Sequence, residues 1–231
     1  MIINKQPPLG SNSDVDKFLS KLATTPLPIS ASDKSKLVFA MDATASREPT
    51  WKQACQLQAE MFNITDCLGG LSIQLCYYRG LTEFKILQWC DNRSKLLKMM
   101  SQVHCLGGHT QIHKVLRHAL AQPDIEAVVF VGDAIEENPD VLCQLSGKLA
   151  LLNIPLFIFH EGFDPYVQSI FKQMAQLSRG AYAPFDLNSA TELKQLLSAV
   201  AVFVAGGQKA LKAFSKDADK IVSNLTRQLK K

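Results

Sequence analysis

Hydrophobic positions along the chain follow two different patterns. Short continuous apolar runs, such as residues 36–41 and 127–131, have the length and composition of strands that are buried on both faces. Longer segments between them carry apolar residues at every third or fourth position, which is the spacing of amphipathic helices. Strands that alternate with helices predict a mostly parallel sheet with helices on both of its faces.

These patterns define the expected elements of one domain at residues 34–205. The strands are expected at residues 36–41, 71–78, 84–89, 127–131, 155–160 and 181–185. The helices are expected at residues 49–65, 93–103, 110–121, 139–152, 165–177 and 190–205. The predicted class is therefore α/β, a doubly wound fold with three layers in the order helix, sheet, helix.

Helical extensions are expected on both sides of this domain. Residues 1–33 form an N-terminal segment, in which residues 14–22 have the apolar spacing of a short amphipathic helix. Residues 206–231 are expected to form one basic amphipathic C-terminal helix. Its apolar positions step by three and four, at Leu211, Phe214, Ala218, Ile221 and Leu225. We expect this stripe to pack on the domain; docking to a partner or to an anionic surface is the alternative.

Charge is distributed unevenly between the domain and this tail. The 231-residue chain has a net charge of +4, but seven of its 25 basic residues and only two of its 21 acidic residues lie in residues 208–231. The rest of the chain is nearly neutral, which disfavours a basic domain that binds nucleic acid. A hydrophobic content of 47% and a charged content of 20% are typical of a globular protein rather than a disordered one.

The cysteines and the chain start bear on the cellular location. The six cysteines lack the close spacing of zinc half-sites, and the sequence opens without the pattern of a secretory signal. We therefore expect free thiols and a cytoplasmic protein. The longest apolar run, residues 196–207, is shorter than the about 20 residues that span a bilayer, so no transmembrane segment is expected.

Polar side chains occur at three places that the predicted fold brings to one edge of the sheet. Asp42, Thr44 and Ser46 follow the first strand, Thr110 opens a helix after Gly107-Gly108, and Asp133 follows a later strand. Because the carboxyl ends of parallel strands line one crevice, these side chains are expected to meet there. Two carboxylates and three hydroxyls form an all-oxygen ligand set, which suits Mg²⁺, with Mn²⁺ or Ca²⁺ as alternatives, better than soft metals.

In these residues the chain resembles the von Willebrand factor A (VWA) domain family with a metal-ion-dependent adhesion site (MIDAS). That family carries the pattern Asp-x-Ser/Thr-x-Ser after its first strand, a threonine on a second loop and an aspartate after a later strand. Asp42, Thr44 and Ser46 match the first element, Thr110 the second and Asp133 the third. Ala45 stands where the family often has glycine. The resemblance covers residues 36–205 and implies a Rossmann-like fold.

The resemblance implies binding rather than catalysis. In this family the bound Mg²⁺ keeps an open position, which an acidic side chain of a partner protein fills. Arg47, His109 and Glu136, together with Glu137, are the residues expected at the rim, either as partner contacts or as solvated loop residues. The implied function is that of a non-enzymatic adaptor or subunit in a complex of the bacterial intracellular type, with an ATPase or chaperone-type assembly as the expected partner.

Two other kinds of site match parts of the sequence. A haloacid dehalogenase-like phosphotransferase would use Asp42 as a phosphorylated nucleophile and Asp133 to hold Mg²⁺, but Thr44 stands where most members have a second aspartate. A zinc site would use Cys105, His109 and His113, which are spaced four residues apart, but Gly107-Gly108 interrupts the helix between them. We expect the adhesion-type site rather than either of these.

Overall fold

The computed structural model describes residues 34–65, 68, 70–122, 124–185, 190–216 and 218–229, without the side chains of residues 58–60 and 190. The N-terminal segment at residues 1–33, including the helix predicted at residues 14–22, lies outside the described residues. The thiols of Cys55, Cys76, Cys90, Cys105 and Cys143 are free, as predicted, whereas Cys67 lies outside the described residues.

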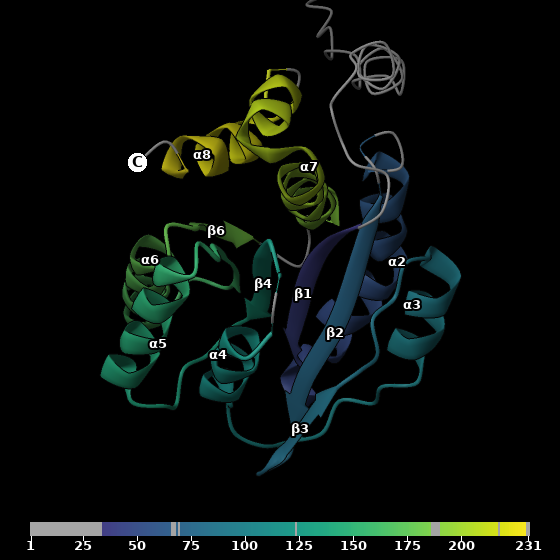
Figure 1. The fold of residues 1–231 in the computed structure, drawn as a ribbon. Helices are drawn as coiled ribbons and strands as arrows, with labels where there is room; N and C mark the ends of the chain where they lie inside the picture. The colour runs from purple at the N-terminus through teal and green to yellow at the C-terminus, as the bar shows by residue number, and fades with distance from the viewer. Residues whose placement is uncertain are drawn as a thin grey trace, which may run out of the picture.

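A sheet of six strands forms the centre of the described part of the chain (Figure 1). Its strands are β1 (Ser35–Asp42), β2 (Leu71–Arg79), β3 (Glu83–Ile86), β4 (Ala127–Gly132), β5 (Leu156–Glu161) and β6 (Ala181–Phe185). The order across the sheet is β3-β2-β1-β4-β5-β6. All neighbours are parallel except β3, which runs antiparallel to β2. The mostly parallel sheet is therefore confirmed.

Helices cover both faces of this sheet, which confirms the three-layer arrangement (Figure 1). The elements are the 3₁₀ helix η1 (Ala45–Arg47) and the α-helices α2 (Glu48–Thr65), α3 (Arg93–Ser101), α4 (Ile112–Leu120), α5 (Pro139–Leu151), α6 (Pro165–Leu177), α7 (Ala190–Phe214) and α8 (Lys220–Gln228). Helices α2, α3 and α7 build one hydrophobic core with the sheet, and α4, α5 and α6 build the other.

The strand β1 shows why continuous apolar runs form the middle of this sheet. Leu37, Phe39 and Met41 belong to the core on the α2 face, whereas Val38 and Ala40 belong to the core on the α4 face. Successive side chains of a strand point to opposite faces, so a strand between two helical layers has no solvent face on which to place polar residues.

The third strand is shorter than its predicted range of residues 84–89. β3 ends at Ile86, and the chain beyond it stays attached to β2 by less regular pairing. Leu87 N donates to Leu75 O at 2.9 Å, and Cys90 forms an isolated antiparallel bridge with Ile73.

Helix starts follow local capping chemistry. Asp164 accepts hydrogen bonds from the backbone N–H groups of Tyr166 and Val167 at the start of α6, and Asn138 does the same for Asp140 at the start of α5. Each cap is followed by proline, whose fixed φ suits the first helical turn.

The C-terminal segment differs from the predicted single helix. α7 continues to Phe214 with a kink at Gly207, where φ is 67° and ψ is −171°, a conformation that favours glycine. A separate helix, α8, then begins at Lys220. Leu211 in α7 and Leu225 in α8 are both fully buried in the core on the α2 face, so the packing interpretation of this segment agrees with the structure.

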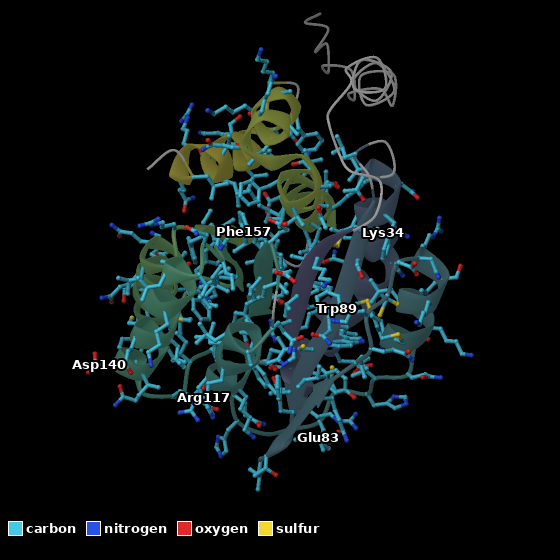
Figure 2. All side chains as sticks on the ribbon, in the orientation of Figure 1. Lys34, Glu83, Trp89, Arg117, Asp140 and Phe157 are labelled. Carbon is cyan, nitrogen blue, oxygen red and sulfur yellow. The ribbon has the colours of Figure 1, made fainter. Side chains whose placement is uncertain are left out.

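Helix α8 also covers the outer edge of the sheet. The side-chain amide of Gln228 accepts from Tyr182 N and donates to Tyr182 O, both at 2.8 Å, and Tyr182 lies in the edge strand β6. An uncovered edge would offer these backbone groups to another chain. α8 lies toward the end of the molecule that Lys34 marks, with α7 between them, whereas Glu83 marks the opposite end (Figure 2).

Helix α7 contains an apolar stretch that matches a membrane span by length and hydropathy. Within the part of the chain that the structure describes, Thr191–Phe214 is the one helical stretch that meets this criterion. Of its apolar window, 61% is buried inside the domain, which is typical of a core helix. The stretch is therefore weak evidence for a membrane span.

We expect Leu225→Ala to destabilise the protein by about 2–5 kcal/mol, because it deletes a fully buried side chain in the core under α8. The matched control is Asn224→Ala, at an exposed position of the same helix, with an expected change below about 0.5 kcal/mol. Urea unfolding followed by circular dichroism measures both. Equal stability of the Leu225 variant and the wild type would show that α8 does not contribute to the cooperative core.

Candidate metal site

The strand order brings two aspartates to the same edge of the sheet. Asp42 is the last residue of β1, and Asp133 follows directly after β4, the neighbour with which β1 pairs. Gly132 packs beside Asp42 and Phe130, since a Cβ atom there would lie 2.7 Å from the ring of Phe130 and 3.6 Å from Asp42 Cβ. A larger residue at position 132 would therefore disturb the packing beneath the two carboxylates.

The loop that carries Thr110 packs against the turn that follows β2. His109 N donates to Gly80 O at 3.1 Å, and Gly80 N donates to Leu106 O at 3.3 Å. A Cβ atom on Gly108 would lie 1.9 Å from Gly80 O, so only glycine allows this approach. Gly108 of the glycine pair therefore lets the Thr110 loop lie against this turn, whereas a Cβ atom on Gly107 would meet nothing within 4 Å.

A pocket of about 220 Å³ lies at this edge of the sheet. Its lining contains all five predicted metal ligands: Asp42, Thr44, Ser46, Thr110 and Asp133. The rest of the lining is Ala45, Gly107, Gly108, Ala134 and Glu136. The structure thus brings the predicted ligands together, whereas metal binding by them stays a prediction.

Asp42 forms the buried floor of the pocket. Its carboxylate accepts from Thr44 N at 2.7 Å through Oδ1 and from the Tyr78 hydroxyl at 3.2 Å through Oδ2. The side chain is almost inaccessible, and this burial raises the pKa of Asp42 to about 6, because loss of solvent outweighs the hydrogen bonds. The negative charge of Asp133 raises the pKa of Asp42 further. A bound cation would relieve this unfavourable burial of charge.

The three hydroxyl groups lie at different depths. Thr44 Oγ1 and Ser46 Oγ are 3.4 Å apart, and Ser46 is exposed at the mouth. Thr110 is buried and fixed by a reciprocal pair of bonds, in which Thr110 N donates to Glu136 Oε2 at 2.8 Å and Glu136 N donates to Thr110 Oγ1 at 2.9 Å. The pocket therefore offers oxygen atoms from its floor to its mouth.

Asp133 is paired with a cation of the protein itself. Arg47 Nη2 lies 3.0 Å from Asp133 Oδ2, and Arg47 Nη1 lies 2.5 Å from Glu161 Oε2. The side chain of Arg47 is only 11% exposed. The expected place of Arg47 on the open rim is therefore wrong: the guanidinium turns inward because two carboxylates at neighbouring strand ends attract it.

The sequence interpretation did not include Glu161 and Thr50 in the site. Glu161 is the buried last residue of β5, and the Thr50 hydroxyl at the start of α2 donates a short hydrogen bond to it. Glu161 ends an apolar strand in the same way that Asp42 does, so the same signal could have identified it. The contact of Thr50 depends on where α2 packs, and no local pattern indicates it.

Of the other residues expected at the rim, two are exposed and one is not. His109 and Glu136 are exposed and face each other, with His109 Nδ1 3.1 Å from Glu136 Oε2. Glu137 instead accepts from Ile112 N and His113 N, and thus caps the start of α4. A role of His109 and Glu136 in partner binding stays a prediction.

The zinc alternative is not supported by the geometry. Among the residues that the structure describes, no group of three or more His, Cys, Asp and Glu side chains is placed to hold a metal ion. His113 Nδ1 contacts Glu137 Oε1 at 2.6 Å, and His109 contacts Glu136. The adhesion-type pocket differs, because it would use only two carboxylates and complete the ligand set with hydroxyl groups and water.

Comparison with known proteins gives matches in structure but not in sequence. No family model matches the chain, and no curated protein matches it. BatB from Bacteroides thetaiotaomicron superposes with a TM-score of 0.55 at 13% identity, covering 72% of this chain and 98% of that chain. The VWA domain of SpRpn10 superposes with a TM-score of 0.54 at 13% identity and the same coverage of both chains.

A third match is proximal thread matrix protein 1 from the mussel byssus, in a structure whose MIDAS motif is occupied by zinc. Its TM-score is 0.55 at 13% identity, covering 74% of this chain and 46% of that chain. This chain has a VWA fold. At such identities the likeness establishes the fold alone, and the VWA fold confirms the predicted fold class.

We expect Asp42→Asn to stabilise the metal-free protein at neutral pH. The pKa of Asp42 is about 6 in the folded chain against an ordinary value of 3.8, so the folded state binds the proton more tightly. Wild-type stability therefore falls as pH rises from about 4 to about 6 and stays lower above that range, by about 3 kcal/mol. The side-chain amide of the Asp42→Asn variant carries no charge, so the variant does not lose this stability as pH rises.

Urea unfolding with EDTA at pH 4 and at pH 8 measures the difference between the two proteins. The variant should gain stability over the wild type at pH 8 and have a much smaller advantage at pH 4. A variant less stable than the wild type at pH 8 would contradict the assigned cost of the buried charge.

Proposed function

We propose that the protein is a non-catalytic interaction module that holds Mg²⁺ in this pocket and binds an acidic side chain of a partner protein through the metal. The convergence of five oxygen-bearing side chains on one pocket supports the proposal most directly. Asp42, Thr44, Ser46, Thr110 and Asp133 would hold the ion directly or through water. The bound ion would supply a concentrated positive charge that a carboxylate from outside can reach at the mouth.

The chemistry of the ligand set supports Mg²⁺ over softer metals. Carboxylate and hydroxyl oxygens are hard ligands, and no thiolate or imidazole lines the pocket. The zinc in the MIDAS motif of the mussel protein shows that a site of this type can hold another divalent ion in that protein. Mn²⁺ and Ca²⁺ are therefore the alternatives to compare by titration.

Exposed apolar side chains at the same edge support a protein as the partner. Leu106 directly precedes the glycine pair of the pocket, and Leu81 lies in the turn after β2 to which that loop is bonded. Phe163 and Tyr166 lie after β5, on the other side of β4. These four side chains are 54–71% exposed, and such groups typically lose solvent contact at protein interfaces. A partner surface that fits this edge would carry an acidic residue with apolar residues beside it.

The environment of Asp42 supports metal ligation over phosphoryl transfer. A nucleophilic aspartate needs a carboxylate oxygen that can reach a phosphoryl group. Both oxygens of Asp42 instead accept hydrogen bonds from within the protein, and its side chain is almost fully buried, which hinders direct attack but leaves it able to hold an ion through water. This favours a non-enzymatic role. In line with the resemblance of the motif to the VWA family, we propose an adaptor or subunit of a cytoplasmic bacterial complex, with an ATPase or chaperone-type assembly as the partner.

We expect Mg²⁺ to bind the wild type and Asp42→Asn to weaken this binding at least about tenfold, because the variant removes one of two carboxylates from the pocket. Isothermal titration calorimetry measures the affinity. The control is Glu126→Gln, an exposed acidic residue in a different pocket beside the C-terminal helices, which should bind as the wild type does. Undiminished affinity of the Asp42 variant would contradict the assignment of the site.

We expect capture of the partner to depend on the divalent ion. Immobilised wild-type protein should retain a specific protein from a cell extract in Mg²⁺ and lose it in EDTA, because the partner's carboxylate would bind through the metal. Immobilised Asp42→Asn protein should not retain that protein, and Glu126→Gln should. A partner retained equally in Mg²⁺ and in EDTA would rule out a metal-bridged contact.

A further inference from the structure

Arg47 is an unusual neighbour for a cation site. It ends the 3₁₀ helix η1, directly after Ser46, and its guanidinium lies between the strand ends of β4 and β5. Its side chain is 11% exposed, so the positive charge is largely removed from solvent. A buried guanidinium beside a candidate metal pocket affects every other cation that enters it.

The guanidinium contacts residues that would hold the metal. Arg47 Nη2 lies 3.0 Å from Asp133 Oδ2, and Arg47 Nε donates to Ser46 Oγ at 3.4 Å. Asp133 Oδ2 and Ser46 Oγ already interact with Arg47, so these oxygen atoms are less available to a metal. A divalent ion bound to either residue would share a ligand with the guanidinium.

The opposite side of Arg47 is anchored. Arg47 Nη1 lies 2.5 Å from Glu161 Oε2, and Glu161 has only 9% of its side chain exposed. The Thr50 hydroxyl donates to the same carboxylate oxygen from the start of α2. This acidic anchor holds the guanidinium at the pocket, so entry of a metal does not simply release it to solvent.

We propose that Arg47 sets the affinity of the pocket for divalent cations, as a fixed positive charge that weakens the binding of Mg²⁺ to the free protein. The proposal rests on the proposed metal-binding function of the same pocket. Like charges that share one carboxylate in a partly buried site repel each other strongly, because little solvent lies between them to screen them.

This repulsion links the metal to the partner. A carboxylate that arrives from a partner adds one negative charge next to both cations and offsets their repulsion. The metal and the partner then each increase the affinity of the protein for the other, since coupling between two ligands is reciprocal. Arg47 thereby favours occupancy of the pocket in the complex over occupancy in the free protein.

The decisive variant is Arg47→Gln combined with Glu161→Gln, which removes both members of the buried ion pair and leaves neither charge alone. We expect calorimetry to show Mg²⁺ binding at least about tenfold tighter than in the wild type. The matched control is Lys52→Gln with Glu48→Gln, which removes an ion pair on α2 whose side chains are 70% and 43% exposed. It should bind Mg²⁺ as the wild type does. Thermal unfolding checks that both double variants are folded.

Glu161→Gln alone tests the proposal in the opposite direction, and decides it if the double variant does not fold. It keeps Arg47 but removes the negative charge behind it, so Mg²⁺ binding should weaken by about threefold or more. Unchanged affinity in this variant, or a folded double variant no tighter than the wild type, would overturn the role of Arg47 and leave the Mg²⁺ site standing. Failure of the wild type and of the variants to bind Mg²⁺ at all would overturn both.

Discussion

Two carboxylates at one edge of the sheet form the constraint around which this site is built. Asp42 and Asp133 are brought there by the pairing of β1 with β4, and burial together with the charge of Asp133 raises the cost of ionising Asp42. Hydrogen bonds and an ion pair from the surrounding groups partly offset this cost. Thr44 N and the Tyr78 hydroxyl donate to Asp42, and Arg47 pairs with Asp133. A divalent cation would complete the same compensation with a larger charge.

The two ends of the sheet differ in the features that they carry. The carboxyl ends of the strands carry the pocket and the exposed side chains of Leu81, Leu106, Phe163 and Tyr166. At the other end, α8 and the end of α7 close the core and cover the edge strand β6. Helix α8 and the end of α7, which carry basic residues of the C-terminal segment, therefore lie at the end of the sheet opposite the pocket (Figure 1). In the proposed function, electrostatic attraction of a partner to the pocket would therefore depend on the local charges of Arg47 and of the bound metal rather than on the net charge.

Prediction from the sequence succeeded where a local pattern has only one structural solution. The short apolar run of β1 predicts a strand between two helical layers, which places Asp42 at the carboxyl edge, and the structure agrees. Sequence-based prediction failed where residues far away in the chain determine the direction of a side chain. Arg47 has the sequence context of a solvated loop residue, but the carboxylates of Asp133 and Glu161 come from strands more than 80 residues later. The direction of the Arg47 side chain could therefore not be predicted from the residues next to it in the sequence.

The C-terminal segment shows the same limit. Its three-and-four spacing is compatible with one straight helix, whereas the structure divides it at Gly207 and again after Phe214. The division lets Leu211 and Leu225 reach the same core while Gln228 reaches the sheet edge.

The sequence by itself thus determined the fold class, most of the strands and helices, and the five oxygen-bearing residues that meet at one pocket, because hydrophobic periodicity and strand ends are local properties. Only the tertiary structure decided which charges meet, since ion pairs between distant strand ends depend on how the layers pack.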